Sequence, residues 1–238
     1  MHHRPLHALL LTVLLTGVMS ASASAALIRL TPDLELETGW ISGVFGDAPN
    51  QFSDAALQSI HTSLWNSGIE TDDRVTVLGL DTDYGTSLIF LIDGPGIGSG
   101  GGDASLSFQS TAPIGRTAWI NDQPDDIAGS INGASGKQVA WGLFNWDPLL
   151  EGDGFAWSNL QPGDGISAMF AAVDESTWPE LQIDDTFQFV GAVDAGWAVL
   201  DTASFSSAGY YSFTAQVVPA PGAFALLVIA GVRRRRRH

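Results

Sequence analysis

Short apolar runs, separated by turns rich in Gly, Asp and Pro, recur along most of this chain and constrain its fold more than any other feature. In the clearest unit, the apolar runs Arg74–Leu80 and Thr86–Ile92 flank the Asp- and Gly-containing segment 81–85. Two strands joined by a short loop of this composition form a β-hairpin. We therefore expect a protein built of strands, with this hairpin as one of its units.

Other runs have the same character, and in two of them the apolar residues alternate with polar ones. The alternation in 186–190 and 211–217 is typical of strands with one buried face, because neighbouring side chains of a strand point to opposite sides. The remaining expected strands are Ala104–Ser110, Arg116–Ile120, Gln138–Phe144, Gly165–Val173, Thr186–Ala192, Gly196–Phe205 and Tyr210–Val218.

One segment, Ser53–Trp65, has apolar residues at helical spacing, at positions 57, 60, 64 and 65. Ser53 or Asp54 is suited to cap the start of a helix, and Gly68 is suited to end it. We expect a short helix that lies across one end of a sandwich.

Many strands at short spacing, without regularly alternating helices, favour one all-β domain. The expected architecture is a single β-sandwich, similar to a jelly roll, that covers residues 26–216. About 190 residues are enough for one substantial core.

The first 25 residues have the three parts of a secretory signal peptide. A weakly basic start at Arg4 is followed by an apolar run from Leu6 to Met19 and then by small residues. Such segments direct export and are removed, and the small residues fit cleavage after Ala25 or, as second choice, after Ala23. We expect residues 1–25 to be a signal peptide and the mature protein to be exported.

The other end, residues 217–238, contains two prolines, an apolar run and five terminal arginines before His238. The apolar run Gly222–Val232 has 11 residues, whereas a membrane-spanning helix needs about 20. An apolar segment followed by a basic cluster is a stop-transfer arrangement, whose basic end stays in the cytoplasm.

This three-part order resembles the PEP-CTERM sorting signal of exported bacterial proteins, although Ala220 stands where the usual motif has Glu. The resemblance implies transient anchoring in the inner membrane and processing by an exosortase, a membrane-embedded cysteine transpeptidase. It also implies delivery to the cell surface or extracellular matrix of a bacterium of the Gram-negative type. The residues that carry the resemblance are Val218, Pro219, Ala220, Pro221, Gly222, Ala223, Arg233, Arg234, Arg235, Arg236 and Arg237.

The body between the two ends is strongly acidic. Residues 26–232 contain 26 acidic and four basic side chains, which leaves a formal net charge of −22. This charge opposes nucleic-acid binding, which depends on the neutralisation of phosphates by Lys and Arg. The chain has no Cys, which excludes disulfides and thiolate metal sites, and the body has one histidine, His61.

Calcium is the one cofactor that the acidic side chains suggest. The sequence Asp81-x-Asp83-x-Gly85 resembles the opening of a calcium loop, in which alternate carboxylates supply some of the six to eight oxygen ligands. An EF-hand loop would end with Glu at its twelfth position, which is Ile92 here, so that class is excluded. Asp in turns also bonds its own backbone, and this structural reading of Asp81 and Asp83 stays open.

Tryptophan is the second candidate for ligand binding, because an amphipathic ring suits contact with a sugar. Of the eight tryptophans, Trp146, Trp157 and Trp178 stand beside Asn, Asp, Ser or Pro and are expected to be exposed. An extracellular polysaccharide is the corresponding partner. The alternative is that these rings fill the core of a domain without disulfides.

A catalytic site is not expected. Glycosidases use two carboxylates, and Glu35 and Glu37 would face the same side of a strand, but no glycosidase motif surrounds them. We expect a surface or matrix protein with a structural or adhesive role and no enzymatic activity. The alternatives are a calcium- or carbohydrate-binding surface module and, third, a surface glycoside hydrolase.

Overall fold

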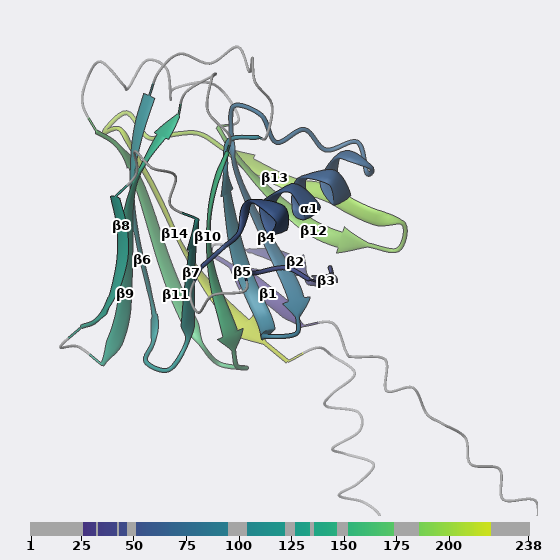
Figure 1. The fold of residues 1–238 in the computed structure, drawn as a ribbon, viewed down its shortest axis with the longest axis horizontal. Helices are drawn as coiled ribbons and strands as arrows, with labels where there is room; N and C mark the ends of the chain where they lie inside the picture. Colours follow the sequence, from purple (N-terminus) through teal and green to yellow (C-terminus); the bar gives the residue numbers. More distant parts are fainter. Residues whose placement is uncertain are drawn as a thin grey trace, which may run out of the picture.

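The computed structural model describes residues 26–31, 33–41, 43–46, 51–94, 104–121, 127–133, 136–146, 152–173 and 186–219. The expected signal peptide lies outside the described residues, as does the sorting signal from residue 220 onward. The described part consists of two β-sheets packed face to face and one helix, so the expected all-β sandwich is confirmed. Figure 1 shows the two layers.

The first sheet, sheet A, is antiparallel throughout. In spatial order its strands are β2 (Leu34–Glu37), β1 (Leu27–Leu30), β14 (Tyr210–Val218), β11 (Gly165–Ala172), β6 (Ala104–Pro113), β9 (Lys137–Trp146) and β8 (Ile127–Asn132).

The second sheet, sheet B, is mixed, because β4 has parallel partners along one edge. In spatial order its strands are β13 (Gly196–Ala203), β12 (Phe187–Val193), β4 (Val75–Thr82), β5 (Gly85–Ile92), β10 (Asp153–Leu160) and β7 (Thr117–Asn121), and β3 (Gly39–Trp40) also pairs with β4.

All nine strands expected from the sequence are present, with ends shifted by a few residues. The expected hairpin is formed by β4 and β5, and Thr82 pairs with Gly85 across a two-residue turn. Five strands were not expected: β1, β2, β3, β8 and β10. The first three have only two to four residues, and β8 and β10 contain Gly, Ser and Asn that are typical of turns.

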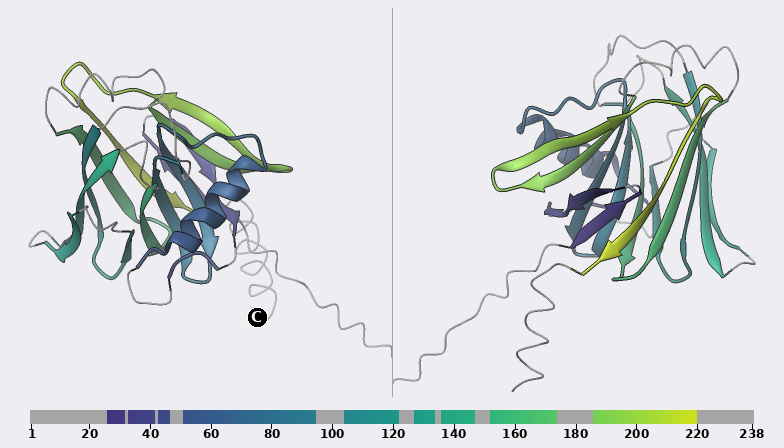
Figure 2. Two further views of the ribbon diagram at one scale, coloured as in Figure 1. Left: turned by 45° about the horizontal axis from the view of Figure 1, so that its top comes forward. Right: turned by 180° about the vertical axis from the view of Figure 1, so that it is seen from behind.

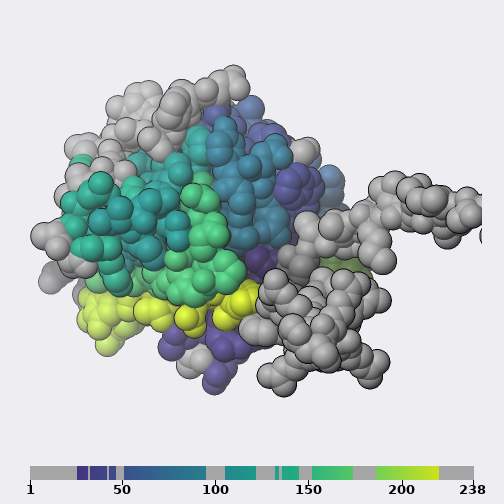
Figure 3. All heavy atoms as spheres, turned by 90° about the horizontal axis from the view of Figure 1, so that it is seen from below, coloured from purple at the N-terminus to yellow at the C-terminus, as the bar shows by residue number. Residues whose placement is uncertain are grey.

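The two ends of the described chain lie side by side in sheet A. Leu27 of β1 pairs with Val218 of β14. The space-filling view in Figure 3 shows this proximity, with the yellow residues of β14 next to the purple residues of the N-terminal strands. The expected signal peptide and sorting signal therefore join the body at neighbouring positions.

The main core lies between the sheets and is rich in phenylalanine. The ring centroid of Phe108 in sheet A is 4.7 Å from that of Phe155 in sheet B and 5.0 Å from that of Phe170. Phe90, Phe155 and Phe170 are each at most 1% exposed. Buried aromatic rings remove large apolar areas from water, which stabilises a domain that has no disulfides.

A second core lies on the outer face of sheet B, beneath the helix α1 (Asp54–Trp65). Leu57, Ile60 and Leu64 of the helix pack with outward-facing residues of the sheet such as Leu78 and Ile89. The helix therefore covers a face of sheet B and does not cross an end of the sandwich, so the expected position was wrong. Figure 2 shows it beside this sheet.

The sequence contains the reason for this position. In β4 and β5 the runs Val75–Leu80 and Leu88–Ile92 are buried without interruption, because sheet A covers one face of these strands and α1 the other. The expected cap is confirmed, since the Ser53 hydroxyl accepts a hydrogen bond from the Ala56 N–H at 3.3 Å. Gly68 follows the helix with a φ of +77°.

Candidate functional site

The outer face of sheet A differs from that of sheet B because it is polar and exposed. Along β14 the exposed residues Ser212, Thr214 and Gln216 alternate with buried apolar ones. The same alternation in β11 and β6 places Ser167, Met169, Gln109 and Thr111 on this face. Period-two alternation is what a sheet with one solvated face requires.

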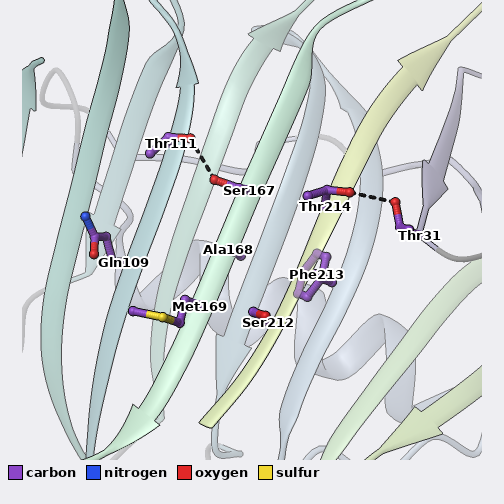
Figure 4. A pocket seen from close by; sticks show the side chains of 9 residues that line it. All are labelled: Thr31, Gln109, Thr111, Ser167, Ala168, Met169, Ser212, Phe213 and Thr214. Atoms are coloured by element: carbon purple, nitrogen blue, oxygen red, sulfur yellow. Dashed lines mark hydrogen bonds between the residues drawn. The ribbon is translucent and has the colours of Figure 1, made fainter. Parts of the chain in front are cut away.

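A shallow hollow of about 520 Å³ lies on this face (Figure 4). We call the surface formed by seven of its lining residues the hydroxyl face. The hydroxyl face consists of Thr31, Gln109, Thr111, Ser167, Met169, Ser212 and Thr214.

Two pairs of hydroxyl groups connect neighbouring strands across the hydroxyl face (Figure 4). The hydroxyls of Thr111 and Ser167 are 2.7 Å apart, and those of Thr31 and Thr214 are 2.6 Å apart. Within each pair one hydroxyl donates to the other, so the pair retains one O–H donor and several acceptor lone pairs. The face is thus held in place and still able to bond a polar ligand.

Exposed apolar side chains border these hydroxyls. Met169 is 42% exposed, Trp141 on β9 is 40% exposed and Tyr210 on β14 is 46% exposed. The strand register places Ser212, Met169, Gln109 and Trp141 opposite one another on four successive strands. Apolar and polar contacts therefore alternate along a line that crosses the strands.

The hydroxyl face carries no ionisable side chain. A neighbouring hollow of about 320 Å³ shares Thr31, Ser167 and Thr214 with it and adds Arg29 and Lys137. The Arg29 guanidinium donates to the Glu35 carboxylate at 2.7 and 2.9 Å, and both side chains are about half exposed. Lys137 pairs with Pro113 at the far end of the β6–β9 ladder.

The structure gives Asp81 a structural role. Its carboxylate accepts hydrogen bonds from the Thr38 hydroxyl at 2.6 Å and from the Thr86 hydroxyl at 2.8 Å. Asp83 is exposed in the two-residue turn between β4 and β5. Within the part of the chain that the structure describes, no three His, Asp or Glu side chains gather in a group that could hold a metal ion.

The tryptophan expectations have three different outcomes. Trp157 is fully buried in the main core, where its indole N–H donates to the Ser110 hydroxyl at 2.9 Å, so its expected exposure was wrong. It belongs to β10, a strand whose two faces are both covered. Trp146 is the last residue of β9, and Trp178 lies outside the described residues.

Trp141 is the binding candidate that sequence reasoning missed. It lies inside the expected strand Gln138–Phe144 and was not among the tryptophans expected to be exposed. The alternation of the strand contained the missing signal, because the small residues Ala140 and Gly142 point inward with Phe144 and leave Trp141 outside.

Buried ionisable side chains lie elsewhere, beyond the hydroxyl face, and Asp93 and His61 are two of them. Asp93 has its side-chain oxygen 2.8 Å from the backbone N–H of Asp73, and burial raises the pKa of its carboxyl to about 6. His61 lies on the buried side of α1 with its Nδ1 atom 2.8 Å from the Thr71 hydroxyl oxygen, and burial lowers its pKa to about 4. Glu35 and Glu37 are both exposed on β2, on one side of the strand, and neither lines the main hollow.

In the described ranges, no helix reaches the length and apolar character that a membrane span needs. Comparison with known proteins finds no matching family, no matching curated protein and no matching solved structure. The function therefore has to be inferred from the residues of this chain.

Proposed function

We propose that this chain is an exported bacterial protein of the cell surface or extracellular matrix, which binds through the hydroxyl face and catalyses no reaction. The carrying observation is the composition of that face. Its hydroxyls, its amide and its exposed thioether and aromatic neighbours suit binding. It holds no carboxylate, imidazole or thiol, which are the groups that general acid–base and covalent catalysis use most often.

The export part of the proposal rests on the two ends of the sequence. The signal peptide expected over residues 1–25 sends the chain across the inner membrane. The segment 217–238 then anchors it transiently and presents it to an exosortase, as the resemblance to PEP-CTERM signals implies. Since Leu27 pairs with Val218, both segments extend from neighbouring positions of the body.

The acidic charge of the body supports the proposed location at the cell surface or in the matrix. A formal net charge of −22 over residues 26–232 keeps copies of the domain apart through mutual repulsion. A crowded surface or matrix protein benefits from this repulsion, because it stays soluble until it is attached.

The sorting part is tested by deletion of Arg233–Arg237 in cells that produce the full chain. We expect the variant to lose C-terminal processing or envelope retention, as judged by mass spectrometry and cell fractionation. Replacement of the five arginines by lysine is the matched control for charge. If the deletion leaves fractionation and processing unchanged, the proposed sorting is wrong.

The binding part is tested by the attachment of purified protein to cells that lack the gene. Met169→Glu places a charge in the centre of the hydroxyl face and should abolish attachment. Trp65→Glu is the control, because Trp65 is 74% exposed on α1, over the other sheet. Equal attachment of both variants would contradict binding through the hydroxyl face.

A further inference from the structure

We propose that the hydroxyl face binds a linear, uncharged polysaccharide that runs across the strands of sheet A. This inference rests on the proposed function and adds the chemical class of the ligand. Three features of the face support it: its hydrogen-bonding groups, its line of exposed apolar side chains and its charge.

The hydrogen-bonding groups match a polyol. The Thr111–Ser167 and Thr31–Thr214 pairs each retain a donor and acceptors, as does the Ser212 hydroxyl. The Gln109 amide adds two N–H donors and a carbonyl acceptor. Sugar hydroxyls both donate and accept, so a sugar satisfies such groups at several points, whereas a purely accepting anion would leave the acceptors unpaired.

The apolar side chains define the direction of the ligand. Ser212, Met169, Gln109 and Trp141 lie opposite one another on β14, β11, β6 and β9. Three strand spacings of about 4.8 Å make this row roughly 14 Å long. The Trp141 ring offers an apolar surface to the C–H side of a sugar, and Met169 does the same near the middle of the row. A linear chain of several sugars fits this row better than a single small molecule.

The charge distribution of the protein favours an uncharged polysaccharide. The body has 26 acidic and four basic residues, so its overall field repels an anionic polysaccharide. Two of the basic residues, Arg29 and Lys137, line the neighbouring hollow, where Arg29 is paired with Glu35. The nine residues that line the hollow carry no charge. An uncharged ligand has no charged group that would lose its hydration on this uncharged lining. The ligand and the face are therefore complementary in being neutral.

The same lining has no side chains that would hydrolyse a bound polysaccharide. Glycoside hydrolysis needs a pair of carboxylates on the two sides of the scissile bond, and the hollow contains none. Retention of a polysaccharide without cleavage is what a surface attachment protein requires.

The test is native affinity electrophoresis of the purified full chain in gels that contain hydroxyethylcellulose, dextran or mannan, with polygalacturonate as the anionic comparison. We expect at least one neutral polysaccharide to retard the wild type. Trp141→Ala should then weaken this binding about five- to tenfold, which is the effect of losing one aromatic contact. The control variant Trp65→Ala should bind like the wild type.

Four results would overturn the inference: no retardation by any neutral polysaccharide, stronger retardation by polygalacturonate, equal weakening in both variants, or a dimer in solution that Met169→Glu disrupts. The last result would identify a second copy as the occupant of the face. If Met169→Glu still abolishes attachment to cells in any of these cases, binding through the face stands and only the ligand class is wrong.

Discussion

Two buried ionisable residues, Asp93 and His61, make opposite contributions to the pH dependence of stability. The pKa of Asp93 is raised from 3.8 to about 6, so its contribution is fully present below pH 3.8 and is lost as the pH rises through 6. The pKa of His61 is lowered from 6.5 to about 4, so its contribution is present above pH 6.5 and is lost as the pH falls through 4. Between pH 4 and 6 the two slopes oppose each other.

Asp93→Asn should therefore unmask the slope of His61. We expect the variant to exceed the wild type in free energy of unfolding by about 2 kcal/mol at pH 7 and to match it below pH 4, because only the charged form of Asp93 is penalised by burial. The Asn amide oxygen can keep the hydrogen bond from Asp73, and Asn tolerates the φ of +61° at this position. Urea unfolding at pH 4, 5.5 and 7 measures the difference, and a difference that does not vary with pH would contradict the assignment.

Trp157 and Trp141 test the distinction between a core ring and a surface ring. Trp157→Ala should lower the free energy of unfolding by about 3–5 kcal/mol, because it leaves a cavity and removes the indole N–H that donates to the Ser110 hydroxyl. Trp141→Ala should change it by less than about 0.5 kcal/mol. Chemical denaturation of both variants checks this, and comparable losses would show that Trp141 is also part of the core.

At the scale of elements, the packing of α1 against sheet B depends on Gly154 of β10. A Cβ atom on Gly154 of β10 would collide with the Leu57 side chain and would lie 2.8 Å from Cε1 of Phe52. Real Cβ atoms do not approach so closely, so the Leu57 and Phe52 side chains beneath the helix would have to shift.

Gly154→Ala should thus destabilise the protein by about 1–3 kcal/mol through overpacking. The matched control is Gly165→Ala on β11, where the added Cβ meets nothing within 4 Å. Thermal unfolding of the two variants decides. A neutral Gly154→Ala would mean that α1 does not pack tightly on β10.

The sequence predicts elements well where a local pattern suffices. Nine strands and the helix follow from period-two alternation, helical spacing and turn residues, and Ser53 caps the helix as expected. The position of α1 does not follow from a local pattern. A continuous apolar run in β4 indicates that both faces of the strand are covered, but it does not indicate which element covers each face.

The candidate site is harder to predict, because exposure of a ring depends on which sheet its strand joins. Trp157 belongs to a strand of sheet B that is covered on both faces, whereas Trp141 belongs to sheet A, which is covered on one. Flanking residues of both rings look similar in sequence. The hydroxyl face itself collects side chains from four segments between residues 31 and 214, and only the strand order brings them together.

At the scale of the whole molecule, the outer faces of the two sheets differ. The central strands β4 and β5 of sheet B are buried on both faces, with α1 over the outer one. Sheet A leaves the uncharged hydroxyl face exposed on a body with a net charge of −22. The first and last strands of the described chain, β1 and β14, pair in this sheet, with Leu27 opposite Val218.

Hydroxyl-radical footprinting of the full chain, with and without a neutral polysaccharide that retards it, tests the central claim most directly. Trp141, Met169 and Tyr210 report on the outer face of sheet A, and Trp40 and Trp65, which are 57% and 74% exposed, are internal controls on other elements. We expect the polysaccharide to protect the first three side chains from oxidation and to leave the two controls unchanged. Protection of Trp40 and Trp65, with Trp141 and Met169 still oxidised, would contradict the account.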